Sequence, residues 1–336
     1  MTSTRPVIDI HTHIMPPAWE DLARKYGAPG WPAVRPAGGC KAMIMLGDRE
    51  FRLVTEQCYS PARRLADMDQ EGLTRQLISP IPVHFCYWGA PDVTAEFARI
   101  QNDFIATTVD ENPSRFVGAG TVAMQSARHA IAELERMKTL GLRVVEMGTN
   151  VNGRDLDDPE IVDILEAAAA LGLAVFAHPW SCIGEERMRA FYLPHMVGLP
   201  AETSLAISRL IFGGVLDRLP NLRIVFAHAG GTFVPLLGRI DHGFAVRAEA
   251  RKIIDQPPSA YLPRLYFDSI THDPRLLESL CATAGSDHVM LGSDYPFDMG
   301  VAHPLDQLAG TRLTGQDLDN ILFRTAERFL GLAEPR

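Results

Sequence analysis

Eight short runs of mostly apolar, β-forming residues alternate along this chain with segments that have the features of helices. The runs do not alternate apolar with polar residues, which is typical of parallel strands whose two faces are both buried. They lie at residues 7–11, 75–80, 115–122, 143–148, 173–178, 222–228, 264–269 and 288–294. This order allows either a (β/α)8 barrel or an open doubly wound sheet. Eight repeats within 336 residues favour an α/β fold of the TIM-type barrel class.

Helices are predicted between these runs, where helix signals flank the apolar segments. The segment 158–172, for example, begins with Asp-Pro and ends with Gly. Similar segments lie near 93–110, 126–141, 203–217 and 273–285, and one continues to about residue 247. We therefore interpret residues 1–336 as a single barrel domain.

Two connections are too long to be plain loops. Residues 14–60 follow the first run and contain "KAMIMLGDREFRLV", which predicts a small hairpin. Residues 181–201 follow the fifth run. Both begin at the carboxyl ends of predicted strands, where the active sites of such barrels lie. We expect 14–60 to be an insertion subdomain over the barrel mouth.

Composition excludes several classes of protein. Hydrophobic residues make up 46% and charged residues 22%, as in ordinary globular domains, and the net charge is −9 with no long basic run. Nucleic-acid binding is therefore not expected. The five cysteines are odd in number and form no C-x-x-C pair, which argues against a disulfide framework and a thiolate zinc site. No segment is apolar enough for a membrane helix, so we expect a cytoplasmic protein without membrane contact.

Residues of the types that bind metals stand at the ends of four predicted strands. His11 and His13 end the first, and side chains two apart on a strand point to the same face. His178 ends the fifth, His228 the sixth and Asp294 the eighth. Inward-facing residues at the tops of barrel strands converge, so these side chains could bind one divalent ion. Imidazoles with a carboxylate suit Zn²⁺ and also accommodate Mn²⁺.

Each of these residues, taken alone, can also be explained by a structural role that involves no metal. The H-x-H pair could be a polar strand end, His178 a capping or core histidine, and Asp294 a helix N-cap. All of these readings would have to hold together at four strand ends, so the metal site is favoured.

The chain resembles the amidohydrolase superfamily, specifically the branch that contains aminocarboxymuconate semialdehyde decarboxylase. The resemblance rests on "IDIHTH", "HPW", "PAETSLAISRLIFGGVLDRLPNLRIVFAHAGG", "LLGRID" and "VMLGSDYPF" and extends over nearly the whole chain. It implies that one divalent metal is bound by His11, His13, His178 and Asp294. It also implies that His228 is the catalytic acid/base, with Asp294 part of the catalytic centre as well as a ligand.

The resemblance further implies two clamps for a substrate carboxylate. These are Arg52, in the hairpin, and Arg239, in "LLGRID", which that decarboxylase donates across a homodimer interface. Arginine suits this role because its planar fork binds a carboxylate through two hydrogen bonds. Without the resemblance, Arg52 would be interpreted as a solvated hairpin residue and Arg239 as a helix-surface partner of Asp241.

Two departures from familiar patterns affect the predicted activity. The fourth run ends in "VVEMG", with no lysine to bridge two metals, and Glu146 there is interpreted as structural. Where the decarboxylase has tryptophans, this chain has Phe191 and His195, which we expect to line the substrate pocket.

The predicted function is metal-dependent, O₂-independent decarboxylation of a small unsaturated or aromatic acid, such as 2-amino-3-carboxymuconate 6-semialdehyde or a hydroxybenzoate. A hydrolase or hydratase on the same scaffold, or a barrel with a purely structural ion, are the alternatives.

Overall fold

The computed structural model describes residues 5–332 and contains an eight-stranded parallel barrel. Each predicted run forms one strand, and the strands follow one another around the barrel in chain order. They are β1 (Ile8–His13), β5 (Arg75–Ser79), β6 (Phe116–Gly120), β7 (Val144–Gly148), β8 (Ala174–His178), β9 (Ile224–Phe226), β10 (Leu265–Asp268) and β11 (Val289–Met290). The backbone N–H of Ile10 donates to the carbonyl of Leu291 at 2.9 Å, which joins the last strand to the first. The predicted barrel is thus confirmed.

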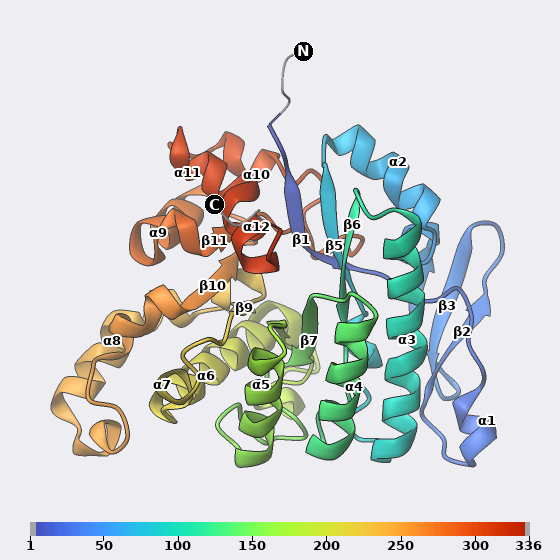
Figure 1. Cartoon of the computed structure of the whole chain (residues 1–336), viewed down its shortest axis with the longest axis horizontal. Helices are drawn as coiled ribbons and strands as arrows, with labels where there is room; N and C mark the ends of the chain where they lie inside the picture. The colour runs from blue at the N-terminus through green and yellow to red at the C-terminus, as the bar shows by residue number, and fades with distance from the viewer. Residues whose placement is uncertain (1–4, 333–336) are drawn as a thin grey trace.

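Helices surround the barrel and cover its outer face (Figure 1). They are α2 (Pro61–Glu71), α3 (Pro91–Glu111), α4 (Ala127–Thr139), α5 (Pro159–Ala170), α6 (Leu199–Phe212), α7 (Val215–Arg218), α8 (Phe233–Val246) and α9 (Pro274–Ala284), followed by the shorter α10 (Asp306–Ala309), α11 (Gln316–Asp319) and α12 (Thr325–Leu330). Local sequence sets several starts: Ser60, Asp158 and Asp273 accept a hydrogen bond from the first turn, and proline follows each of them.

Two apolar layers hold the barrel together. Inward-facing residues such as Ile10, Leu77 and Phe176 fill the interior, where Phe329 and Leu330 of α12 pack against them. Arg143 and Arg223 donate to carbonyls at 329–331, so α12 closes the amino-terminal end of the barrel. A larger apolar layer lies between the strands and the outer helices. The carboxyl ends of the strands are therefore the end at which a cavity can open.

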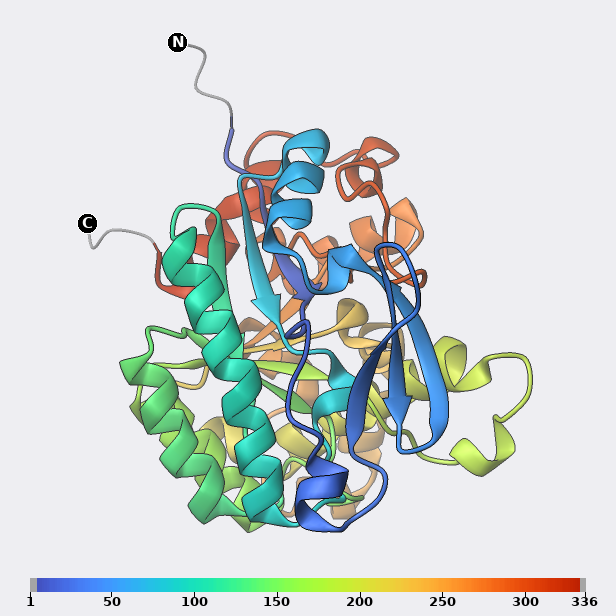
Figure 2. The ribbon, with the colours of Figure 1, turned by 90° about the vertical axis from the view of Figure 1, so that its right-hand side faces the viewer.

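The long first insertion carries α1 (Leu22–Tyr26) and an antiparallel sheet of β2 (Pro32–Pro36), β3 (Lys41–Leu46) and β4 (Arg49–Thr55). The expected hairpin is β3–β4. The sequence did not reveal β2, because prolines at both its ends resemble a loop, although an edge strand tolerates them. Figure 2 shows this sheet beside the barrel, next to the yellow-green segment around 181–198. Among residues 5–332, no helix is both long and apolar enough to cross a membrane.

Candidate metal centre and substrate cavity

Five polar side chains converge at the carboxyl ends of the strands. The ligand atoms of His11, His178, His228 and Asp294 all lie within 4.8 Å of one another. His13 Nε2 lies 3.2 Å from His11 Nε2 and 3.1 Å from Asp294 Oδ1. The structure therefore brings together all the residues that the sequence placed at the metal. His228 is also within ligand range, although the sequence assigned it to proton transfer.

Hydrogen bonds fix the orientation of three of the imidazoles. The Nδ1 atoms of His11, His13 and His178 lie 2.6, 2.8 and 2.9 Å from Asp268 Oδ2, the Pro80 carbonyl and the Pro179 carbonyl, respectively. These partners are acceptors, so each Nδ1 carries a proton and each Nε2 points to the cluster.

The buried donor set fits a divalent cation. His178 Nε2 is buried and has no hydrogen-bond partner among the described residues. Burial, followed by the nearby histidines, holds the His178 pKa well below its ordinary value, so the ring is neutral. Burial opposes ionisation of Asp294, but the neighbouring imidazoles of His13 and His228 prevail and hold its pKa well below its ordinary value. Neutral imidazoles around a carboxylate are the form in which these groups bind metals.

Asp268 is a residue of the candidate site that the sequence analysis missed. In addition to the hydrogen bond from His11 Nδ1, its carboxylate accepts hydrogen bonds from the backbone N–H groups of His228, Ala229 and Ile270 at 2.7–3.0 Å. One carboxylate thus orients a ligand and holds the turn that carries His228. The available signal was its place at the end of the seventh β-run, where barrel residues are often catalytic.

Local backbone conformation brings the later ligands into place. His228 and Asp294 have positive φ angles of 54° and 60°, a conformation that is uncommon for non-glycine residues and is found in clusters at active sites. Gly292 allows the segment after the last strand to pass close to β1 and β10. A Cβ there would lie 3.0 Å from the Cβ of His11 and 2.9 Å from that of Asp268.

Glu146, at the end of β7, is fully buried behind His13. Its Oε1 lies 3.7 Å from His13 Nδ1, which is the nitrogen facing away from the cluster, and burial raises its pKa to about 8. Its carboxylate oxygens have no hydrogen-bond partner among the described residues. Glu146 therefore borders the site without facing the other ligand atoms.

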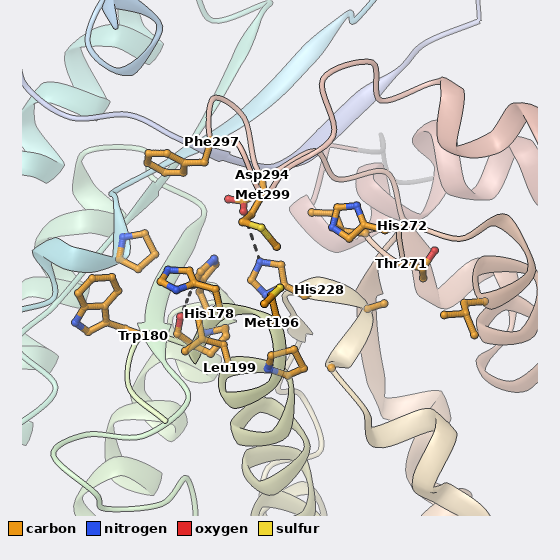
Figure 3. Close-up of a pocket in the computed structure, with 18 of the residues that line it drawn as sticks. His178, Trp180, Met196, Leu199, His228, Thr271, His272, Asp294, Phe297 and Met299 are labelled. Atoms are coloured by element: carbon orange, nitrogen blue, oxygen red, sulfur yellow. Dashed lines mark hydrogen bonds and ion pairs between the residues drawn. The ribbon is translucent and has the colours of Figure 1, made fainter. Parts of the chain in front are cut away.

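A cavity of about 660 Å³ opens above the cluster. In Figure 3, His178, His228 and Asp294 lie at its centre, with Trp180 and Phe297 on one side and Thr271 and His272 on the other. Its lining is largely apolar, with a few polar groups, which is the usual character of a small-molecule site.

Arg52, for which the resemblance implied a carboxylate clamp, is one of the residues that line the cavity. One guanidinium nitrogen donates to the Tyr192 hydroxyl at 2.9 Å, and the group stacks 4.9 Å from the centre of the Phe297 ring. His195 also lines the cavity and stacks on Tyr192, with ring centres 4.1 Å apart.

Two predicted substrate residues lie outside the cavity. Phe191 is 85% exposed and does not line it, whereas the next residue, Tyr192, does. Arg239 lies in a separate groove between α6 and α8, so it does not reach the cavity of its own chain. The sequence alone could not separate Phe191 from Tyr192, because adjacent loop residues have no periodicity that fixes their direction.

Comparison with known proteins agrees with this geometry. The family model described as Amidohydrolase matches residues 8–332. A Dictyostelium discoideum protein named 2-amino-3-carboxymuconate-6-semialdehyde decarboxylase is 41% identical over 97% of this chain and 91% of its own length.

Solved structures share the fold. The apo structure of Metarhizium anisopliae IDCase aligns with a TM-score of 0.86 at 24% identity, covering 99% of both chains. A dihydroxybenzoic acid decarboxylase from Polaromonas sp., solved with manganese and 2-nitroresorcinol, aligns with a TM-score of 0.79 at 21% identity over 99% of this chain and 98% of that one.

Proposed function

This chain belongs to the amidohydrolase family, in its 2-amino-3-carboxymuconate-6-semialdehyde decarboxylase-like branch, and on that premise we propose that it is a metal-dependent carboxy-lyase. Its substrate is a small unsaturated or aromatic acid, with 2-amino-3-carboxymuconate 6-semialdehyde first and hydroxybenzoates second, and the reaction uses no O₂. The observation that carries this proposal is the convergence of the imidazoles and Asp294 beneath a cavity that Arg52 also lines.

The residues that would hold the metal are His11, His13, His178 and Asp294. Such an ion supplies Lewis acidity toward the oxygen atoms of the substrate. We propose a single ion, because the end of β7 offers Glu146 rather than a lysine and Glu146 faces away from the ligand atoms. Zn²⁺ suits this donor set, and the manganese in the Polaromonas enzyme makes Mn²⁺ the alternative to test.

His228 is proposed to move the proton. Loss of CO₂ breaks the carbon–carbon bond and leaves its electron pair on the remaining carbon, which must then be protonated. The His228 side chain is 22% exposed, lines the cavity, and has its Nε2 3.7 Å from Asp294 Oδ2. An imidazole at this position can hold a proton at Nε2 and transfer it to the substrate.

Arg52 would bind a carboxylate of the substrate at the mouth, beside His195. We propose that Arg239 completes a second clamp from the partner subunit of a homodimer, because in its own chain it lies outside the cavity. The cysteines of the chain are free, which agrees with the cytoplasmic location that we propose.

The test combines metal analysis with CO₂ release from the semialdehyde and from a panel of hydroxybenzoates. We expect one ion per chain and stoichiometric CO₂ release from one of these acids. His228→Ala should retain the metal and lose CO₂ release. Turnover of lactones or amides without CO₂ release would instead indicate a hydrolase, and undiminished activity of His228→Ala would contradict its assigned role.

A further inference from the structure

Arg64 is an arginine in α2 with 0% solvent exposure, which is rare for this residue type. Among residues 5–332, no carboxylate lies within 4.0 Å of its guanidinium nitrogens, although Asp9 and Asp67 lie near enough to favour its charged form. Burying a cation costs several kcal/mol unless other groups compensate for lost hydration. The neighbours of the Arg64 guanidinium therefore indicate what its burial stabilises.

The guanidinium lies behind the strand end that carries two of the proposed metal ligands. It donates to the carbonyl of His13 and, at 3.0 Å, to the Oγ1 of Thr12. These groups belong to the H-x-H segment, where the pairing of β1 with β5 is irregular. The same guanidinium also donates to Gln76 Oε1 at 3.1 Å and to the Gln57 carbonyl at 3.2 Å.

Arg64 also contacts the segment that carries Asp294. Its guanidinium lies 4.7 Å from the centre of the Tyr295 ring, and the Tyr295 hydroxyl donates to Asp67 of the same helix at 2.7 Å. The backbone joins the two segments directly, since His13 N donates to the Tyr295 carbonyl at 2.8 Å. One helix thus holds both segments that bring three of the four proposed ligands together.

We propose that Arg64 is a positioning residue for the metal centre. It fixes the spacing of His11, His13 and Asp294 by binding the His13 carbonyl and Thr12 while stacking on Tyr295. This inference rests on the proposed metal site. A planar fork is required, because lysine has a single nitrogen and cannot make these separated hydrogen bonds and the stacking contact together.

The test measures the dissociation constants of Zn²⁺ and Mn²⁺ in the full chain by competition with a chelator, together with the absorption spectrum of the Co²⁺ form. Loss of groups that orient metal ligands typically weakens metal affinity by about 10- to 100-fold, and we expect this for Arg64→Met. Arg64→Lys should recover part of the affinity and still show a changed Co²⁺ spectrum.

Arg223→Met is the matched control. Arg223 is half-buried and also donates to backbone carbonyls, of Phe329 and Gly172, but at the opposite end of the barrel. Its loss should lower the melting temperature and leave the metal dissociation constants unchanged, which is the signature of a purely structural arginine.

Wild-type metal affinity in folded Arg64→Met would overturn the inference. If Arg64→Met does not fold, Arg64→Lys decides: wild-type affinity with a wild-type Co²⁺ spectrum would overturn the requirement for the fork. A wild-type chain that binds neither ion would overturn the proposed metal site as well, so the two failures are distinguishable.

Discussion

The two ends of the cavity are built in different ways. The floor consists of the proposed metal ligands at the ends of the strands, His11, His13, His178 and Asp294, and of two buried residues behind them, Asp268 and Arg64. The roof consists of Arg52, Tyr192 and His195, which come from the two long insertions. Floor groups are buried, and Asp268 among them accepts hydrogen bonds from His11 and from the backbone of His228 and Ala229. In the roof, Tyr192 is 42% exposed and has a positive φ of 59°.

This difference suggests a division of labour. A rigid floor keeps a fixed ligand geometry, which the chemistry of a bound ion requires. Loops over a barrel mouth can vary without disturbing the strands, so substrate choice is expected to reside there. The predictions below test whether substitutions in the floor affect metal binding and stability, and substitutions in the roof affect substrate affinity.

The largest effect is expected for Asp268→Ala. It leaves the Nδ1–H of His11 and three backbone N–H groups without an acceptor in a buried site. Removing one partner of such a buried network costs about 3–5 kcal/mol of stability. We expect loss of bound metal and of activity, measured by elemental analysis, calorimetry and CO₂ release. Asp268→Asn keeps the shape of the side chain but has one acceptor oxygen, so its metal content and activity should lie between those of Asp268→Ala and the wild type. Full metal occupancy in Asp268→Ala would show that the floor does not depend on this network.

Removal of the metal should also act on the floor and not on the roof. An ion present at 100 times its dissociation constant stabilises the folded state by about 2.7 kcal/mol. Chelation should therefore lower the melting temperature and speed amide hydrogen exchange at the ends of β1 and β8. Exchange in residues 181–198 should change little. A response concentrated in 181–198 would mean that the roof, too, depends on the ion.

The same division explains what the sequence could and could not predict. Strand ends are readable, because buried parallel strands are continuous apolar runs and a terminal histidine or aspartate stands out after them. All eight strands and the five polar residues from His11 to Asp294 were found in this way. Asp268 also ends a strand, but its contacts to His11 and to the turn at His228, which define its role, join segments far apart in the sequence and become evident only in the fold. Arg64 likewise looks like any helix arginine until the packing of α2 is known.

Arg52 is the roof residue whose loss should matter most. Hydrogen bonds to charged groups are worth about 1.5–3 kcal/mol, so Arg52→Ala should lower kcat/KM by about 10- to 100-fold, mainly through KM. Metal content should stay at the wild-type level. Arg49→Ala is the matched control, because Arg49 is exposed on the same strand, β4. A wild-type KM in Arg52→Ala would show that Arg52 does not bind the substrate carboxylate.

The smallest effect on KM is expected at Tyr192, and none is expected at its neighbour Phe191. Tyr192→Phe removes the hydroxyl that accepts from Arg52 at 2.9 Å but keeps the ring that stacks on His195. Because this exposed bond orients Arg52 and does not itself bind the substrate, KM should rise by less than about tenfold while kcat and metal affinity stay unchanged. Phe191→Ala should leave KM unchanged, because Phe191 is 85% exposed and lies outside the cavity. The opposite result, with Phe191→Ala raising KM and Tyr192→Phe silent, would mean that this segment turns Phe191 inward when substrate binds. The roof would then reach its final conformation only with substrate bound, whereas the floor is already formed in the free protein.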